Sequence, residues 1–392
     1  MVVNGLDRKL QLVAYFGCEG LKDLYNDWLQ LINHISNLCF SHFPQWYDAY
    51  LNRTSEAKDS LLFCALYRGS MLVAVFPLVS KTEKPFGLMA LAVPSGKLLW
   101  MPDFIVAEEE DSAELFQFLC ENISSETGIK WDLIKIDGTL ETSHASRCLS
   151  GKAGLCTFSK ITATCNTLIL MPYEQSLHKY SKNFKARLRK ARNKLVKLEN
   201  IDFHKVHKPE ELAWAFDEFM TLEASGWKGS KQKIKGHEAG SAIALHETKR
   251  KFYERLVRDL GDYGIVEINL LRIGKKTIAA QLALVIRDTC YLLKITYDEG
   301  YAALSPGNML LEYLLKGYEG DALVKYVCLI TNYPWHMDWK PMQLRYMNYM
   351  YFNKTQKGLL AYSILKLNEA GKNLLRKVKK DIATLQRSVA GT

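Results

Sequence analysis

Apolar residues recur along this chain at two spacings, one typical of helices and one typical of strands. The first apolar residues at helical spacing are Leu21, Leu24, Trp28, Leu31 and Ile35. Residues 61–80, LLFCALYRGSMLVAVFPLVS, form two apolar runs that meet at Arg68-Gly69-Ser70, and this pattern predicts a β-hairpin. Residues 264–297 predict three more strands, with turns at Gly274-Lys275 and Asp288-Thr289.

The second half of the chain repeats the order of the first. The hairpin that turns at Gly274 follows the one at Gly69 by 205 residues, and each half begins with helical segments. Such self-similarity over half the length indicates an internal duplication. We therefore expect an α/β protein of two halves, residues 1–175 and 176–392, each a mixed, mostly antiparallel sheet flanked by helices.

The most basic part of the chain lies between the halves, at residues 179–198. Nine lysines and arginines occur there without an acidic residue. A stripe at helical spacing is formed by Phe184, Leu188, Ala191, Leu195 and Leu198. This pattern predicts a basic linker helix docked by its apolar face. Its basic face is either simply solvated or binds an anionic partner, such as a phosphate-bearing ligand or a membrane surface.

Composition narrows the class of protein. The chain has 392 residues, 48% of them hydrophobic, and 52 basic against 42 acidic residues give a net charge of +10. The nine cysteines are scattered, with no CxxC pair or Cys/His metal-finger interval, so we expect thiols in a reducing, cytoplasmic setting and no metal. Motifs such as GxSxG, HExxH, GxxxxGK[ST] and GxGxxG are absent, which disfavours hydrolase, zinc, P-loop and dinucleotide sites.

The segment TLEASGWKGS, residues 221–230, ends a predicted helix and is the first candidate site. Glu223 continues the apolar stripe of that helix, and Trp227 and Lys228 follow beside glycines. A carboxylate among apolar residues has a raised pKa, which suits a general base. The alternative is that Glu223 leaves the core because the helix ends there.

Two later segments complete the set of candidates. In YDEGYAALSPGNMLLEYLL, residues 297–315, a strand ends at Tyr297-Asp298 and a helix opens at Ser305-Pro306-Gly307-Asn308. The free N–H groups of such a helix start can hold a pyrophosphate, although the same residues make an ordinary capping turn. In TNYPWHMDWKPM, residues 331–342, polar and aromatic residues crowd the end of a strand, namely Asn332, His336, Asp338, Trp339 and Lys340. They either line a pocket or include a structural ion pair.

Taken in order, these segments resemble the CelD/BcsL-type acetyltransferase domain of the GNAT superfamily, which is related to the Fem peptidyltransferases. The elements of that family match Arg187–Arg192, Gly226-Trp227-Lys228, Tyr297-Asp298 with Ser305-Pro306-Gly307, and Asp338 with Trp339-Lys340. Two departures stand out. The usual pyrophosphate motif, Gln/Arg-x-x-Gly-x-Gly/Ala, is replaced by Ser-Pro-Gly-Asn, and Trp339 stands where the family tends to have tyrosine.

The resemblance implies two tandem GNAT-like halves and direct transfer from acetyl-CoA or another acyl-CoA, without a metal. The acceptor it implies is an amine or hydroxyl of a small-molecule, sugar-linked or cell-envelope precursor, as in polysaccharide biosynthesis. Two alternatives remain: a Fem-like transferase that uses aminoacyl-tRNA, and a catalytically degenerate binding module. The basic helix is also a candidate for peripheral membrane contact.

The resemblance also suggests roles for individual residues. The acid/base candidates are Asp298, Glu223 and Asp338, with Lys340 and Lys228 orienting anionic groups. The phosphate cradle is assigned to Ser305, Pro306, Gly307 and Asn308, and substrate binding to Trp227, Lys228, Tyr297, Trp339, Arg187 and Arg189.

Overall fold

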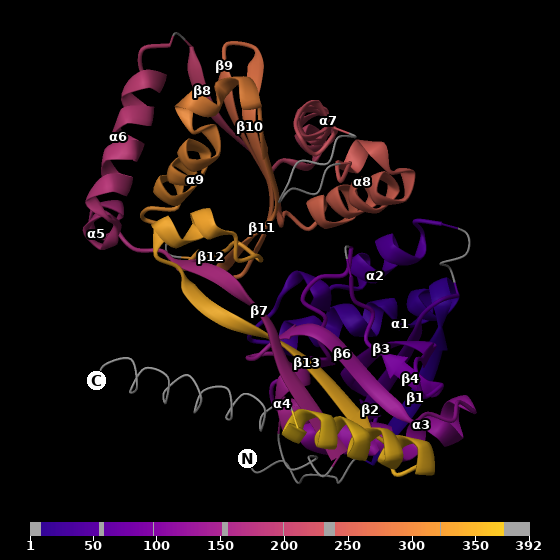
Figure 1. Cartoon of the computed structure of the whole chain (residues 1–392). Coiled ribbons are helices and arrows are strands. Elements are labelled where there is room, and N and C mark those ends of the chain that lie inside the picture. Colours follow the sequence, from indigo (N-terminus) through magenta and orange to yellow (C-terminus); the bar gives the residue numbers. More distant parts are fainter. Residues whose placement is uncertain are drawn as a thin grey trace, which may run out of the picture.

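The fold is built from two halves joined through one continuous sheet (Figure 1). The computed structural model describes residues 9–54, 59–96, 98–150, 156–198, 200–230, 240–321 and 323–371. In the first half the strands are β1 (Leu10–Phe16), β2 (Leu62–Arg68), β3 (Met71–Glu83), β4 (Leu88–Ala92), β5 (Ile105–Val106), β6 (Leu133–Leu140) and β7 (Thr157–Ile169). Its helices are α1 (Gly17–Leu31), α2 (Pro44–Leu51), α3 (Ser112–Thr127) and α4 (His144–Ser150), with short 3-10 turns η1 (Ile32–His34) and η2 (Phe40–His42).

The second half repeats this order of elements. Its strands are β8 (Ile201–Val206), β9 (Val266–Ile273), β10 (Lys276–Ile286), β11 (Thr289–Tyr297), β12 (Tyr326–Cys328) and β13 (Met342–Phe352). Its helices are α5 (Tyr173–Lys179), α6 (Lys182–Leu195), α7 (Pro209–Ser225), α8 (Glu247–Gly261) and α9 (Pro306–Gly317), with 3-10 segments η5 (Ile243–Leu245), η6 (Glu299–Leu304) and η7 (Pro334–Trp339). Both predicted hairpins are confirmed, as β2–β3 and β9–β10–β11.

The strand order of the sheet relates the two halves by a pseudo-two-fold. It runs β1-β2-β3-β4-β6-β13-β7-β12-β11-β10-β9-β8, with β5 beside β3. If each strand is replaced by its counterpart in the other half, the result is the same strand order read from the opposite edge of the sheet. The last strand of each half therefore pairs with the other half, since β13 lies between β6 and β7. The exchanged strands join the halves structurally, and the division at residue 175 stays a prediction from the sequence.

Helices cover both faces of the sheet. On one face, α1, α2, α7 and α8 share a single apolar core that runs across both halves. Trp46 of α2 meets Phe252 of α8 with ring centroids 5.5 Å apart, and Arg255 Nε donates to Asp48 Oδ2 at 2.5 Å. On the other face, α3 and α4 cover the first half, whereas α6 and α9 cover the second. The shared core fixes how the two halves lie against each other.

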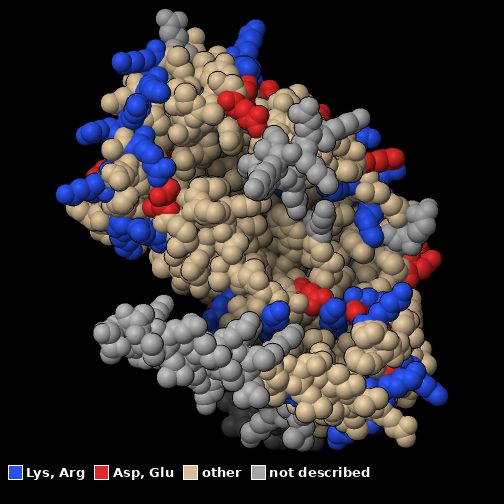
Figure 2. Space-filling model, viewed as in Figure 1, with Lys and Arg blue, Asp and Glu red and all other residues tan. Residues whose placement is uncertain are grey.

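The basic helix is shorter than the sequence predicts. Residues 173–179 form α5, and α6 begins at Lys182 because the Ser181 side chain accepts from the Phe184 backbone N–H. The predicted stripe is buried from Phe184 to Leu195, but Leu198 lies beyond the helix and is 38% exposed. The prediction of one helix over 179–198 was therefore wrong at both ends. Figure 2 shows Lys and Arg side chains gathered over α6.

No helix among the described ranges is long and apolar enough to cross a membrane. Residues 356–371 form a further helix, which packs against the first half through Ala361, Tyr362 and Leu365.

Candidate functional site

The candidate site lies where two neighbouring strands separate. β11 and β12 pair in parallel only from Thr289–Tyr291 to Tyr326–Cys328, after which β11 continues to Tyr297 while β12 ends. The register of β11 against β10 also shifts, because Ala283 faces Leu292 whereas Leu282 faces Lys294. Leu293 is therefore a β-bulge, and such a residue is left out of the regular ladder pairing. Backbone polar groups are thus presented at the opening between the strands.

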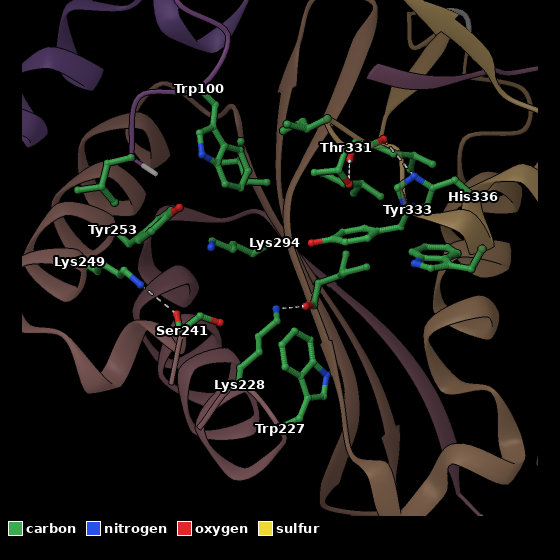
Figure 3. A pocket seen from close by; sticks show the side chains of 17 residues that line it. Trp100, Trp227, Lys228, Ser241, Lys249, Tyr253, Lys294, Thr331, Tyr333 and His336 are labelled. Carbon is green, nitrogen blue, oxygen red and sulfur yellow. Dashed lines mark hydrogen bonds between the residues drawn. The ribbon is translucent and has the colours of Figure 1, made fainter. Parts of the chain in front are cut away.

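A cavity of about 350 Å³ fills this opening, and we call it the β11–β12 cavity (Figure 3). β11 supplies Leu292 to Ile295, and the segment after β12 supplies Leu329 to Thr331. The remaining walls come from five other places in the chain: the turn after α7, Ser241 before η5, helix α8, η7 with the residue before it, and the loop before β5 in the first half. That volume is in the range of small-molecule sites, which mix apolar walls with a few polar groups.

Trp227 and Lys228, both predicted as site residues, line this cavity. The Lys228 ammonium donates to the Ile295 carbonyl at 2.6 Å and lies 3.1 Å from the Glu223 carboxylate. The other oxygen of Glu223 accepts from the Ile243 backbone N–H at 2.8 Å. Glu223 itself is 1% exposed and does not line the cavity. These contacts make Glu223 an anchor for Lys228 and for η5.

The turn after α7 is held by a close backbone approach. Gly229 N–H donates to the Gly226 carbonyl at 2.9 Å, and a Cβ on Gly229 would lie 1.7 Å from the Ala224 carbonyl oxygen. Only glycine fits there without displacing backbone. The Gly-Trp-Lys-Gly sequence therefore fixes where Trp227 and Lys228 enter the cavity.

Two lysines reach the cavity from the opposite side. Lys294 Nζ lies 5.2 Å from the ring centroid of Trp100 and 5.6 Å from that of Tyr253. Lys249 Nζ donates to the Ser241 carbonyl at 3.2 Å. Figure 3 shows the Lys294 side chain extending into the middle of the cavity, between Tyr253 and Tyr333. Aromatic faces attract such cations, so this wall combines positive charge with flat apolar surfaces.

His336 contributes a buried imidazole. Its Nδ1 lies 3.1 Å from the Thr331 carbonyl oxygen, to which it donates in the tautomer that carries the hydrogen on Nδ1. The Asn166 side-chain amide lies 3.2 Å from the same nitrogen. Burial lowers the pKa of His336 to about 4, so the ring is neutral at pH 7. Nε2 is then left as a hydrogen-bond acceptor.

Tyr297 and Asp298 lie at the end of β11, outside the lining of the cavity. One Asp298 oxygen accepts from the Gly300 backbone N–H at 2.8 Å, and the other lies 2.7 Å from Lys276 Nζ. The hydrogen bond from Lys276 is the main reason that the pKa of Asp298 is lowered. These contacts are those of a carboxylate that caps η6, and its role as a base stays a prediction.

The predicted phosphate cradle opens α9, on the sheet face opposite α7 and α8. Ser305 has a left-handed backbone with φ of 50°, and Pro306 is the first residue of α9. Lys194 of α6 donates to the Ala303 carbonyl at 3.3 Å, which brings the basic helix beside this turn. Asn308 Oδ1 accepts from Trp339 Nε1 at 3.2 Å. The side chain of Asn308 therefore orients Trp339, whereas the backbone of the turn remains the candidate cradle.

The late predicted residues surround α6. Trp339 is 2% exposed and packs on Phe184 with ring centroids 5.1 Å apart. Asp338 pairs with Arg187 at 2.7 Å and not with Lys340. Trp339 and Lys340 line a separate hollow of about 50 Å³. Arg189 is exposed on α6. These residues lie outside the lining of the β11–β12 cavity, and their predicted roles remain untested.

Several residues of the cavity were not among the predicted site residues. Trp100 comes from the first half, Tyr253 and Lys249 from α8, Lys294 from β11, and Tyr333 from the position just before η7. Of the lining residues, Thr331, Tyr333, Trp335 and His336 belong to the segment 331–342 that the sequence had marked as pocket-like. Lys294 carried the one available signal, a lysine inside an otherwise apolar strand.

The comparisons with known proteins agree with this geometry. Residues 182–340 match the family model described as Acetyltransferase (GNAT) domain. This match lies within the second half, and the matched range includes the bulged β11, the helix start at α9 and η7. A comparison with curated proteins finds no match.

Solved structures resemble almost the whole chain. A crystal structure of FemX has a TM-score of 0.55 and 12% identity, and it covers 86% of this chain and 97% of that one. The structure of L-PGS from Bacillus licheniformis has a TM-score of 0.48 and 12% identity, covering 86% and 96%. A tandem GNAT protein from the clavulanic acid biosynthesis pathway has a TM-score of 0.46 and 9% identity, covering 89% and 100%.

The fold is therefore the expected one, two GNAT-like halves of mixed α/β structure. At 12% identity the FemX likeness concerns the fold alone. The CelD/BcsL subtype remains a prediction from the sequence. Within the described ranges, no three His, Cys, Asp or Glu side chains are grouped as metal ligands.

Proposed function

We propose that the β11–β12 cavity is an acyl-transfer site, in which an acetyl or longer acyl group passes from acyl-CoA to an amine or hydroxyl. The acceptor we favour is a sugar-linked or other cell-envelope precursor, on the resemblance to the CelD/BcsL-type domain. The observation that carries the proposal is the bulge at Leu293 in the strand that borders the cavity, within the range matched by the GNAT model.

The bulge supplies the means of polarising a thioester. Backbone N–H groups that are aimed at a developing oxyanion lower the barrier of acyl transfer, because their dipoles need no reorganisation. At β11 such groups lie in the mouth between two strands, where the Leu292 and Leu293 side chains exclude water. We assign the carbonyl of the donor to this place.

Two side chains suit the proton transfers. The attacking amine or hydroxyl loses a proton as its bond to the carbonyl carbon forms, and Nε2 of His336 is an acceptor in the cavity. The bond from carbon to sulfur then breaks, and the thiolate takes a proton. Tyr333 is 52% exposed and its ring projects into the cavity in Figure 3, so its hydroxyl can donate that proton and regain one from solvent.

Other residues position the substrates. Trp227 and Lys228 form one wall, held by Glu223. The turn Ser305–Asn308 remains our candidate for the donor pyrophosphate, since Lys194 of α6 bonds to the residue two positions before it. For Asp298 and Asp338, the contacts with Lys276 and Arg187 favour structural roles over acid/base chemistry.

A thermal-shift titration with acetyl-CoA and longer acyl-CoAs tests the proposal without knowledge of the acceptor. A ligand at a hundredfold its Kd stabilises the folded state by about 2.7 kcal/mol. We expect a saturable rise in Tm with at least one acyl-CoA. The absence of any rise with every acyl-CoA would favour a degenerate binding module instead.

A second candidate, a Fem-like transferase that uses aminoacyl-tRNA, is favoured by the exposed basic face of α6 (Figure 2). Binding of charged tRNA should weaken steeply with salt, because each phosphate contact releases counterions. Titration with aminoacyl-tRNA at two salt concentrations, beside acyl-CoA, separates the two donors. A tRNA complex that forms while acyl-CoA does not bind would replace the first proposal by the second.

A further inference from the structure

A second cavity, of about 400 Å³, lies where the two halves meet, and we call it the interface cavity. Met101 and His144 of the first half and Tyr326 and Met342 of the second are among its lining residues. It shares no lining residue with the β11–β12 cavity.

A third hollow adjoins both cavities. This hollow has a volume of about 280 Å³ and shares Met101 with the interface cavity. It shares Trp100, Ile330 and Thr331 with the β11–β12 cavity. The third hollow therefore borders the interface cavity through Met101 and the proposed transfer site through Trp100, Ile330 and Thr331.

His144 is the unusual group in the interface cavity. It is 1% exposed, and neither of its ring nitrogens has a hydrogen-bond partner within the described ranges. Burial lowers the pKa of His144 to about 4, so the ring is neutral at pH 7 and offers one donor and one acceptor. Buried polar groups without partners cost stability, and the rare native cases require an explanation. A ligand hydroxyl at this wall of the cavity, which can donate or accept, would give one of these nitrogens a partner.

The nearby charged groups are already engaged by the protein. His42 Nε2 lies 3.0 Å from Asp103 Oδ2, and Asp103 Oδ1 accepts from the Ala145 backbone N–H at 2.7 Å. Arg287 donates to backbone carbonyls in η1 and at Ser36 just beyond it, at 3.3 to 3.4 Å. Asp288 accepts from the Thr289 hydroxyl at 3.0 Å. Recognition in this cavity therefore falls mainly to neutral groups.

Hydroxyl groups dominate that neutral lining. They include those of Thr139, Thr142, Ser143, Thr289, Tyr291 and Tyr326. Apolar side chains such as Leu38, Leu140 and Leu344 line other parts of the same cavity. A sugar ring carries hydroxyls that donate and accept along its edges and C–H groups on its faces, which matches this alternation of polar and apolar surface.

We propose that the interface cavity binds a neutral sugar unit, with His144 hydrogen-bonded to one of its hydroxyl groups. The assignment of that sugar to the acceptor of acyl transfer rests on the proposed function, whereas the binding itself does not. In that assignment the acceptor would extend from the sugar past the hollow lined by Met101 and Trp100 toward the β11–β12 cavity.

Saturation-transfer NMR on the full chain tests the proposal, with methyl β-D-glucopyranoside and N-acetylglucosamine as probes and butanol as an apolar alcohol. We expect saturation transfer to a sugar but not to butanol. His144→Phe should weaken sugar binding at least tenfold while its free energy of unfolding stays equal or rises, because two unpaired nitrogens are removed. His144→Gln, which can donate and accept, should retain part of the binding.

Three controls keep the test decisive. If His144→Phe does not fold, the variant Thr142→Val/Tyr326→Phe, on half-buried and exposed positions, carries the comparison. Titration of the same variants with acetyl-CoA should match wild type, so a failed sugar site and a failed donor site give different patterns. Lys294→Met, in the other cavity, should leave sugar binding unchanged. Absence of saturation transfer to both sugars, or unchanged sugar binding in the His144 or Thr142/Tyr326 variants, would overturn the proposal.

Discussion

The ammonium of Lys228 lies 3.1 Å from the carboxylate of Glu223 and donates to the carbonyl of Ile295, so Lys228 links the end of α7 to β11. Glu223 is fully buried and the Lys228 side chain is 16% exposed. Removing one partner of a buried ion pair destabilises the fold, because the other charge is left without a counter-ion. Glu223 is therefore a positioning residue for the cavity wall and for η5.

Replacing Glu223 by Gln should lower the free energy of unfolding by about 3 kcal/mol, because the buried Lys228 ammonium loses its counter-ion. Chemical denaturation measures the change. The exposed pair Glu247–Lys251 offers a matched control, and Glu247→Gln should change stability by less than about 0.5 kcal/mol. The double variant Glu223→Met/Lys228→Met should recover much of the loss. If Glu223→Gln kept full stability yet abolished transfer, Glu223 would be a base and not an anchor.

Replacing Asp298 by Asn should leave acyl transfer close to wild type, since Asp298 lies outside the cavity lining and pairs with Lys276. Its pKa is lowered in the folded state. A lowered carboxylate pKa stabilises the fold above the ordinary aspartate value of 3.8, and that contribution is lost as the pH falls through the folded pKa. The stability difference between wild type and Asp298→Asn should therefore shrink on acidification below pH 4. A collapse of kcat at neutral pH in a folded Asp298→Asn protein would restore Asp298 as the base.

Replacing Gly229 by Ala should destabilise the protein by about 1–3 kcal/mol, because the added Cβ meets the Ala224 carbonyl. The displaced turn should also weaken donor or acceptor binding at Trp227 and Lys228. Gly317→Ala is the matched control, since a Cβ there meets nothing within 4 Å, and it should be neutral or slightly stabilising. Denaturation curves of the two variants give the comparison. Equal stability of both would show that the turn adapts.

Acidification should destabilise the fold through the two buried histidines, His336 and His144. The pKa of His336 and that of His144 are each lowered to about 4, so between pH 6.5 and 4 the unfolded chain binds more protons than the folded one. The contribution of the two neutral histidines to the free energy of unfolding should therefore be complete above pH 6.5 and should decrease as the pH drops toward 4. Denaturation of His336→Phe across this range should show a shallower slope than wild type. An identical slope would mean that His336 is not held neutral by burial.

The sequence predicted what depends on local spacing and missed what depends on long-range pairing. The hairpin at Gly69 and the helix start at Pro306 follow from alternation and from turn residues. The prediction placed α6 correctly by its buried stripe, but it began the helix at residue 179 and extended it to Leu198. In the structure the cap at Ser181 starts the helix at Lys182, and the helix ends at Leu195. The insertion of β13 between β6 and β7 has no local signal, since both flanking strands come from the other half.

The candidate site follows the same rule. Trp227 and Lys228 were found because a Gly-Trp-Lys-Gly turn is locally unusual, and both line the cavity. Trp100 was missed because it lies more than a hundred residues away in the other half and meets Lys294 only through the shared core. The carboxylates were favoured as bases for their residue type, but their partners, Lys228 for Glu223 and Arg187 for Asp338, are brought to them by the fold.

Acyl-CoA is expected to bind where β11 and β12 separate, and a variant that blocks the cavity tests this binding. Ile295→Trp places a large ring in the cavity, whereas Ile161→Trp adds the same bulk at an exposed position of β7 that lines none of these cavities. Isothermal titration calorimetry with acetyl-CoA should give saturable binding for wild type and Ile161→Trp, and at least tenfold weaker binding for Ile295→Trp. Binding of equal strength in all three proteins, or no binding in any, would contradict acyl-CoA binding in the β11–β12 cavity.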